Sequence, residues 1–308
     1  MANRYAVATG NWSNTATWDG GTLPGSGDTV RPNGFTVTID QDVTVSAISF
    51  KASSPAVAGG KVLVSGSRII NADLDVYAHT SVEIPVLASL VVNGNVVNTV
   101  SAYGGSNQGI YVNGGDVVVN GSMTAGNGND NICMKLSTGT ATVNGTVSGG
   151  TSDSYCIYQS GGTLTINGDV LCPGTGGGGG HAVYGASNAA TLIWTGGHTA
   201  RGNGVSRRAF EIGGGVCDLE GIFATPLSGL STPYTWFTES VRVNVSSTGK
   251  ARLGGVSEIG GIGIVSMPGV SINSAVGFVQ EFRSDANWPT SVYNQIPKYL
   301  YDRPNTDE

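Results

Sequence analysis

The chain has 308 residues, a formal net charge of −6 and a charged fraction of only 12%. Glycine is abundant at 49 residues, Val, Thr, Ser and Asn are frequent, and Leu, Glu and Lys are scarce. This composition disfavours helices and favours short strands joined by tight turns. The sequence has no dense Lys/Arg run and no stretch of about 18 apolar residues, so we expect no nucleic-acid partner and no membrane insertion.

Residues 1–50 are expected to form an N-terminal cap together with the first strands. Trp12 and Trp18 are large enough to plug an open end, and Phe35, Val37 and Ile39 alternate as in a strand. The first residues lack the apolar core of a signal peptide, so we expect synthesis in a cytoplasm without the usual secretory route.

The run "WSNTATWDGG" and the run "PGSGDTVRPNGFTVTIDQDVTV" that follows it resemble the start of β-helical structural proteins encoded by tailed bacteriophages. Related openings occur in bacterial surface proteins. The resemblance covers roughly the first 50 residues, and beyond them only the general style of the coils is similar. It implies a structural role in a virion, and it carries no catalytic motif that could be transferred to residues of this chain.

Residues 51–228 repeat one short phrase, an apolar strand that ends in Asn-Gly. The anchor asparagines are Asn93, Asn120, Asn144 and Asn167, and degenerate copies follow at Thr195-Gly196 and Glu220-Gly221. The spacing of about 25 residues indicates a repeat architecture. Positions one before, three before and three after the anchor are apolar in nearly every copy, and a second apolar position lies ten residues before it. Each copy therefore predicts two strands with one buried face each.

We predict an all-β fold, a right-handed parallel β-helix with coils of about 24–28 residues that rise by about 4.8 Å each. Val143 and Ile166 should then point into a continuous apolar interior. The glycine of each Asn-Gly is expected to adopt a positive φ where the chain turns between sheets. An antiparallel meander or propeller is the alternative, because Asn-Gly is also a hairpin signal. Like residues at like positions in every copy favour the β-helix.

The C-terminal region departs from the repeat. Residues 229–284 are expected to form a last coil or a C-terminal cap, and residues 285–308 an extended arm, because prolines there block regular strands. The arm has aromatic anchors suited to a neighbouring subunit, although packing of the tail on its own domain is the alternative. The predicted interaction residues are Tyr293, Tyr299, Leu300 and Tyr301.

Catalysis by a β-helix on glycans requires paired carboxylates or a base beside acidic metal ligands. The weak candidates are Glu211, Asp218 and Glu220 in "RRAFEIGGGVCDLEG". Glu211 and Asp218 should face outward but from different strands, and the repeat columns supply no carboxylate pair from neighbouring coils. An outward column lies nine residues before the anchor and contains Tyr111, Lys135, Tyr158, Tyr184 and Glu211. We expect this column to form a ladder that binds sugar or protein; the alternative is that it is merely a solvated face.

Histidine and cysteine patterns give no reason to expect a cofactor or a metal ion. His181 follows a run of five glycines and is expected to face solvent, whereas His198 falls in an apolar column. Asp40 and Asp42 flank a turn, which is a weak calcium signal.

Cys133 and Cys156 occupy the same position in adjacent coils. We expect them to be free thiols, because parallel strands in register aim both Cβ atoms alike. Cys217 falls in an inward column and is expected to be buried.

The hypothesis that these observations favour is a structural protein of a bacteriophage virion. It would be a β-helix displayed on the surface, as a capsid decoration, head fibre or tail-associated fibre, made in the cytoplasm of the host bacterium. We expect a homotrimer whose partners are other virion proteins of the capsid or tail, with a host surface glycan as a possible ligand. The alternatives are a tailspike-like glycan depolymerase and a bacterial surface adhesin.

Overall fold

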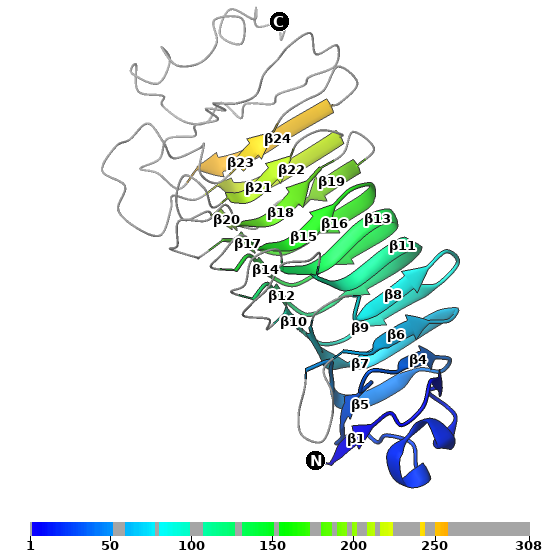
Figure 1. Ribbon diagram of the computed structural model, residues 1–308. Helices are drawn as coiled ribbons and strands as arrows, with labels where there is room; N and C mark the ends of the chain where they lie inside the picture. The colour runs from blue at the N-terminus through cyan, green and yellow to red at the C-terminus, as the bar shows by residue number, and fades with distance from the viewer. Residues whose placement is uncertain are drawn as a thin grey trace, which may run out of the picture.

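The protein is a rod of stacked β-strand coils, and β1 lies at one end of it (Figure 1). The computed structural model describes residues 2–51, 59–77, 80–98, 107–126, 131–150, 154–172, 180–186, 190–195, 199–201, 208–212, 216–223, 241–243 and 250–257. Two short 3-10 helices, η1 (Thr15–Thr17) and η2 (Asp19–Gly21), precede the main run of strands. Every pairing between the named strands of these residues is parallel. The parallel β-helix is thus confirmed, and the antiparallel alternative is excluded.

The strand pairings define three stacks that run along the rod. The first contains β1 (Asn3–Tyr5), β3 (Thr29–Arg31), β10 (Val96–Asn98), β12 (Met123–Thr124), β14 (Val147–Ser148), β17 (Val170–Leu171) and β20 (Thr199–Arg201). The second contains β2 (Gly10–Asn11), β4 (Thr36–Ile39), β6 (Lys61–Val64), β8 (Val82–Pro85), β15 (Tyr155–Gln159), β18 (His181–Gly185), β21 (Arg208–Ile212) and β23 (Val241–Val243). The third contains β9 (Ser89–Val92), β16 (Gly162–Ile166), β19 (Ala190–Trp194) and β24 (Lys250–Ser257). Longer strands pair in two stacks; these are β5 (Val43–Ser49), β7 (Ser67–Val76), β11 (Asn107–Val119), β13 (Asn131–Val143) and β22 (Val216–Phe223).

The apolar columns predicted from the repeat form the interior of the rod. In the third stack, residues one before each anchor pair in register and are at most 1% exposed; they are Val92, Val119, Val143, Ile166 and Trp194. In the second stack, the position ten before the anchor is equally buried; it contains Ile110, Met134, Ile157, Val183 and Phe210. Full burial of such a side chain stabilises the fold by about 1.5–3 kcal/mol. Hydrophobic burial therefore sets the register of successive coils.

The glycines of the four anchor Asn-Gly steps do not turn the chain in the way the sequence suggested. Gly94, Gly121, Gly145 and Gly168 are absent from the described glycines with positive φ, so that prediction is wrong. A Cβ on any of them would collide with a backbone carbonyl oxygen of the coil before, at Ala72, Gly94, Gly121 and Gly145 respectively. Glycine is required here because two backbones approach closely, which is the other use of a residue without a side chain.

The anchor asparagines form a ladder of side-chain amides along the outside of the rod. Each Nδ2 donates to the Oδ1 of the asparagine one coil earlier, from Asn93 to Asn71 at 2.7 Å, Asn120 to Asn93 at 2.6 Å, Asn144 to Asn120 at 2.7 Å and Asn167 to Asn144 at 2.8 Å. Asn71 Nδ2 donates to Thr44 Oγ1 at one end, and Thr195 Oγ1 donates to Asn167 Oδ1 at the other. We call this chain of hydrogen bonds the asparagine ladder. It explains why the repeat keeps asparagine at a position that the core does not touch.

The N-terminal end of the apolar interior is closed by two tryptophans. Trp12 and Trp18 are 2% and 1% exposed, their rings meet edge to face with centroids 4.8 Å apart, and Trp18 Nε1 donates to the Trp12 carbonyl oxygen. Both tryptophans therefore belong to the buried apolar core. The strands around them already belong to the coils, because β1 pairs with β3 and β3 pairs with β5.

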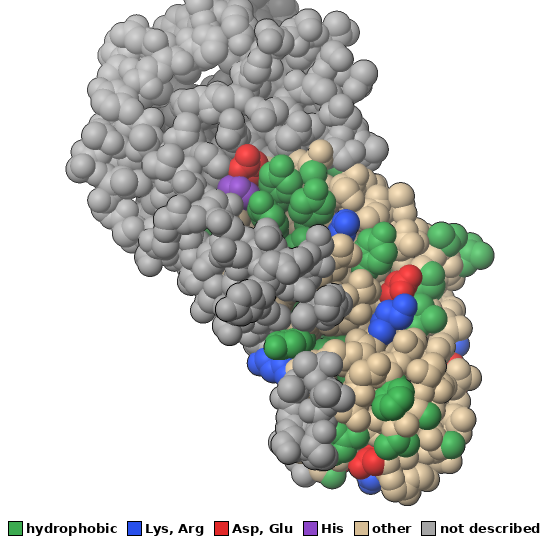
Figure 2. All heavy atoms as spheres, viewed as in Figure 1, with side chains coloured by type: hydrophobic (Ala, Val, Ile, Leu, Met, Phe, Trp, Pro, Cys, Tyr) green, Lys and Arg blue, Asp and Glu red, His purple; other side chains and the backbone are tan. Residues whose placement is uncertain are grey.

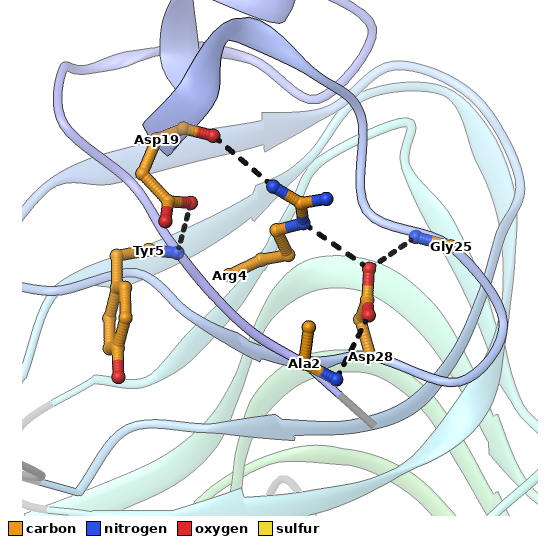
Figure 3. A network of polar contacts seen from close by, with 6 residues as sticks. All are labelled: Ala2, Arg4, Tyr5, Asp19, Gly25 and Asp28. Atoms are coloured by element: carbon orange, nitrogen blue, oxygen red, sulfur yellow. Dashed lines mark hydrogen bonds and ion pairs between the residues drawn. The ribbon is translucent and has the colours of Figure 1, made fainter.

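A polar network ties the first strand to the loop that follows η2 (Figure 3). The carboxylate of Asp28 accepts from the backbone N–H groups of Gly25 and Ala2 and from Arg4 Nε at 3.4 Å. Arg4 Nη1 also donates to the carbonyl oxygen of Asp19, whose carboxylate accepts from the Tyr5 N–H. The network therefore holds the edge strand β1 in place.

Candidate interaction surface

The outward ladder expected from the repeat is present on the second stack. Consecutive coils place Tyr111, Lys135, Tyr158, Tyr184 and Glu211 directly above one another in register. All of them are half-buried. Figure 2 shows hydrophobic side chains gathered on this face, next to histidine and acidic side chains.

Four rings from β15 and β18 pack together on this face, and we call them the tyrosine cluster: Tyr155, Tyr158, His181 and Tyr184. Tyr184 stacks on Tyr155 with ring centroids 5.0 Å apart, and it contacts Tyr158 at 5.4 Å and His181 at 6.0 Å. Tyr155 also stacks on His181 at 5.7 Å. Such ring pairs contribute about 0.5–1.5 kcal/mol beyond the burial of area.

The tyrosine rings of this column contact neighbouring side chains of the rod. Lys135 Nζ lies 5.7 Å from the ring centroid of Tyr111 and 5.9 Å from that of Tyr158, which is cation–π geometry on both sides. Tyr158 therefore contacts Lys135 and Tyr184. These contacts leave the tyrosines only half-exposed to a partner.

His181 is buried, so the prediction that it faces solvent is wrong. It is 6% exposed and packs against both Tyr155 and Tyr184, and its Nε2 is 2.8 Å from Glu211 Oε2. The glycine run before it suggested an exposed loop, but the register pairs His181 with Tyr155 at the start of β18. The periodicity of the inward columns gives no signal for this contact.

The environment of Tyr184 favours its neutral form. Burial is the main cause that raises its pKa above the usual value near 10, and the nearby charge of Glu211 and then Tyr158 add to it. Tyr184 therefore keeps its hydroxyl proton well into the alkaline range and can act as a hydrogen-bond donor.

The three carboxylate candidates do not form a catalytic pair by register. Glu211 pairs with Tyr184 and Arg242 in the adjoining coils, and its carboxylate contacts His181. On β22, the register neighbours of Asp218 are Ile193 and Arg252, and Glu220 pairs with Gly254. The structure describes only the backbone around Asp218 and Glu220. Neighbouring coils thus supply arginine or neutral residues at these positions, as the repeat columns indicated.

The described part of the chain contains no group of three or more His, Cys, Asp or Glu residues arranged to hold a metal ion. Asp40 and Asp42 instead join coils, because Asp40 accepts from the Ser13 N–H and Asp42 from the Ile69 N–H.

Cys133 and Cys156 are free thiols, and both are buried. Cys133 Sγ donates to the Thr124 carbonyl oxygen at 2.9 Å. Burial is the main cause that raises the pKa of the Cys156 thiol, and the neighbouring Cys133 raises it further. The side chain of Cys217 lies outside the described residues.

The predicted C-terminal contacts cannot be placed on this surface, since Tyr293, Tyr299, Leu300 and Tyr301 lie outside the described residues, as does His198. Of residues 229–284, the described strands are β23 and β24, which pair with β21 and β22.

Comparison with protein-family models, with curated proteins and with solved structures found no match to this chain. Among the residues that the structure describes, no helix has the length and apolar character needed to cross a membrane.

Proposed function

We propose that this chain is a structural protein of a bacteriophage virion, a rigid β-helix displayed on the particle as a capsid decoration, head fibre or tail-associated fibre. The observation that carries the proposal is the parallel pairing of strands in successive coils from β1 to β24 among the described residues. The resemblance of the first 50 residues to β-helical phage proteins gives the proposed setting. A rod of this kind serves projection, reinforcement or attachment through its shape.

The polar groups on the outer face support a structural role over a catalytic one. Glu211 is engaged with His181, Lys135 with two tyrosine rings, and the anchor amides with one another. These contacts join successive coils, so they stabilise the rod. Half-exposed tyrosine edges on the same face suit contact with a second subunit.

The proposed assembly is a homotrimer that contacts other virion proteins of the capsid or tail. Mass spectrometry of purified virions tests the central proposal. We expect peptides of this chain in particles that have been separated from host debris in a density gradient. Their absence from infectious particles that contain the major capsid protein would overturn the proposal. Electron microscopy of particles labelled with an antibody to the chain then distinguishes head from tail.

A tailspike-like glycan depolymerase is the second candidate, and the closeness of Glu211 to the tyrosine cluster is the observation in its favour. It requires loss of host polysaccharide on incubation with the purified protein, and sensitivity of that loss to Glu211→Gln, Asp218→Asn or Glu220→Gln. Intact polysaccharide after incubation with the folded protein would exclude it.

A further inference from the structure

An Asn-Gly step is prone to deamidation in any polypeptide, and the repeat contains several such steps. The backbone nitrogen of the glycine attacks Cγ of the preceding asparagine, a C–N bond forms, and ammonia leaves to give a succinimide. Water then opens the ring to aspartate or isoaspartate, so the net change is the replacement of the amide by a carboxylate with release of ammonia. The reaction requires the asparagine side chain to rotate towards the glycine nitrogen and the glycine peptide to adapt.

The asparagine ladder opposes the first requirement. Asn93, Asn120, Asn144 and Asn167 each donate from Nδ2 to the coil before and accept at Oδ1 from the coil after. The amide planes are thus held along the axis of the rod by two hydrogen bonds each. Rotation towards the glycine nitrogen breaks both.

The packing of the glycines opposes the second requirement. A Cβ on Gly94, Gly121, Gly145 or Gly168 would collide with a backbone carbonyl of the coil before. The backbone N–H of each anchor asparagine also donates to the preceding coil, as from Asn144 to the Val119 carbonyl oxygen at 2.9 Å. The peptide that must move is therefore fixed on both sides of the asparagine Cα.

Asn113-Gly114 in β11 is the same dipeptide in a different environment. It lies at an irregularity of the strand, where the register shifts after Val112 and again after Asn113. Asn113 is exposed, and its side chain makes no hydrogen bond to another of the described residues. Gly114 has φ of 97°, and the nearest atom to a Cβ built there belongs to the side chain of Val86 and not to backbone.

We propose that Asn113 is a site of spontaneous deamidation in the folded protein and that the ladder protects the four anchor asparagines from the same reaction. The ladder has a second purpose in this account besides joining coils. A carboxylate at Asn120 would face the Oδ1 of Asn93 with no proton between them, and two such carboxylates in adjacent coils would lie about 4.8 Å apart and repel each other. Protection therefore preserves the register of the whole stack over the lifetime of the protein.

The test is peptide mapping by mass spectrometry of the full chain after incubation in mildly alkaline buffer. Deamidation at each Asn-Gly is followed by its mass gain, in the folded protein and in guanidinium. In the folded protein we expect Asn113 to react at least about tenfold faster than any anchor asparagine, since both hydrogen bonds of a ladder amide must break before it can react. In guanidinium the sites should react at similar rates. Equal rates at Asn113 and the anchors in the folded protein would overturn the proposal.

A single substitution at the end of the ladder separates local hydrogen bonding from general rigidity. Thr195→Val removes the hydroxyl that donates to Asn167 Oδ1 and keeps the shape of the side chain. We expect a several-fold faster reaction at Asn167 with no change at Asn93. Thr142→Val is the matched control, because Thr142 is an outward residue of β13 whose hydroxyl makes no hydrogen bond to the ladder, and it should leave all four rates unchanged. An unchanged rate at Asn167 in a Thr195→Val protein that melts at the wild-type temperature would contradict the role of the ladder.

Discussion

At the scale of single residues, the close approach of a backbone carbonyl oxygen from the preceding coil requires glycine at the anchor Asn-Gly steps. The carbonyl oxygen of Gly121 occupies the space where a Cβ of Gly145 would be, and the same contact recurs at each anchor. The packing of one coil on the next therefore depends on the absence of a methyl group at one position in each turn. Backbone atoms cannot move aside as the end of a flexible side chain can.

Gly145→Ala should destabilise the protein by about 1–3 kcal/mol, the usual cost of forcing an extra carbon into a packed interior. Gly27→Ala is the matched control, because nothing lies within 4 Å of a Cβ at Gly27. The control should be neutral or slightly stabilising, since alanine restricts the unfolded chain. Urea unfolding of both variants measures the difference, and equal midpoints would contradict the close backbone contact.

Cys156 should resist alkylation in the folded protein. Its burial raises the thiol pKa, so the reactive thiolate is scarce even in mildly alkaline buffer. A thiol whose pKa is raised by folding stabilises the fold fully below its unfolded pKa of about 8.5, and that contribution is lost as the pH rises. Labelling with iodoacetamide followed by mass spectrometry should modify Cys156 in guanidinium and leave it unmodified in buffer. Rapid labelling of the folded chain would show that the interior column is open.

At the scale of elements, the first strand is held by charge as well as by pairing. The Gly25 N–H is the largest cause that lowers the pKa of Asp28, burial opposes it, and the Ala2 N–H and Arg4 lower it further. The loop from Gly25 to Asp28 and the start of β1 therefore share one carboxylate (Figure 3).

Asp28→Asn should reduce the sensitivity of the protein to acid. Because folding lowers the pKa of Asp28, its contribution to stability is present above the unfolded value near 3.9 and is lost as the pH falls through the folded value. The wild type should lose more stability than the variant between about pH 5 and pH 3. Thermal melting across this range measures the effect. Parallel pH profiles for the two proteins would show that the network does not depend on the charge of Asp28.

The inward face of each element could be predicted from the sequence, because stacked coils require the same residue type at the same place. Val143, Ile166 and their column are buried for that reason. The contact of His181 with Glu211 could not be predicted in the same way, because it joins strands through side chains that do not repeat. The sequence shows that asparagine recurs at the anchor positions. It does not predict the hydrogen bonds of the asparagine ladder, because these depend on the direction of the side chains, which spacing alone does not give.

At the scale of the whole molecule, each coil contacts mainly its neighbours, so stability is distributed along the rod as in other repeat proteins. The apolar columns of the three stacks and the asparagine ladder share one geometric condition. Successive copies of the repeat must be adjacent strands in parallel register. The proposed role as a rigid virion component depends on the same condition.

The distance between copies of the repeat tests this condition most directly. Pulsed dipolar spectroscopy can measure the distances between spin labels at residues 69 and 165 and between labels at residues 69 and 193. All three positions belong to one outward column, whose residues pair in register in successive coils: Ile69, Val91, Val118, Thr142, Thr165 and Ile193. We predict separations of about 19 Å and 24 Å, an increase of about 4.8 Å for each coil. An increase of about 9.6 Å for each copy, the value for repeats separated by an intervening antiparallel strand, would contradict the stacked parallel coil.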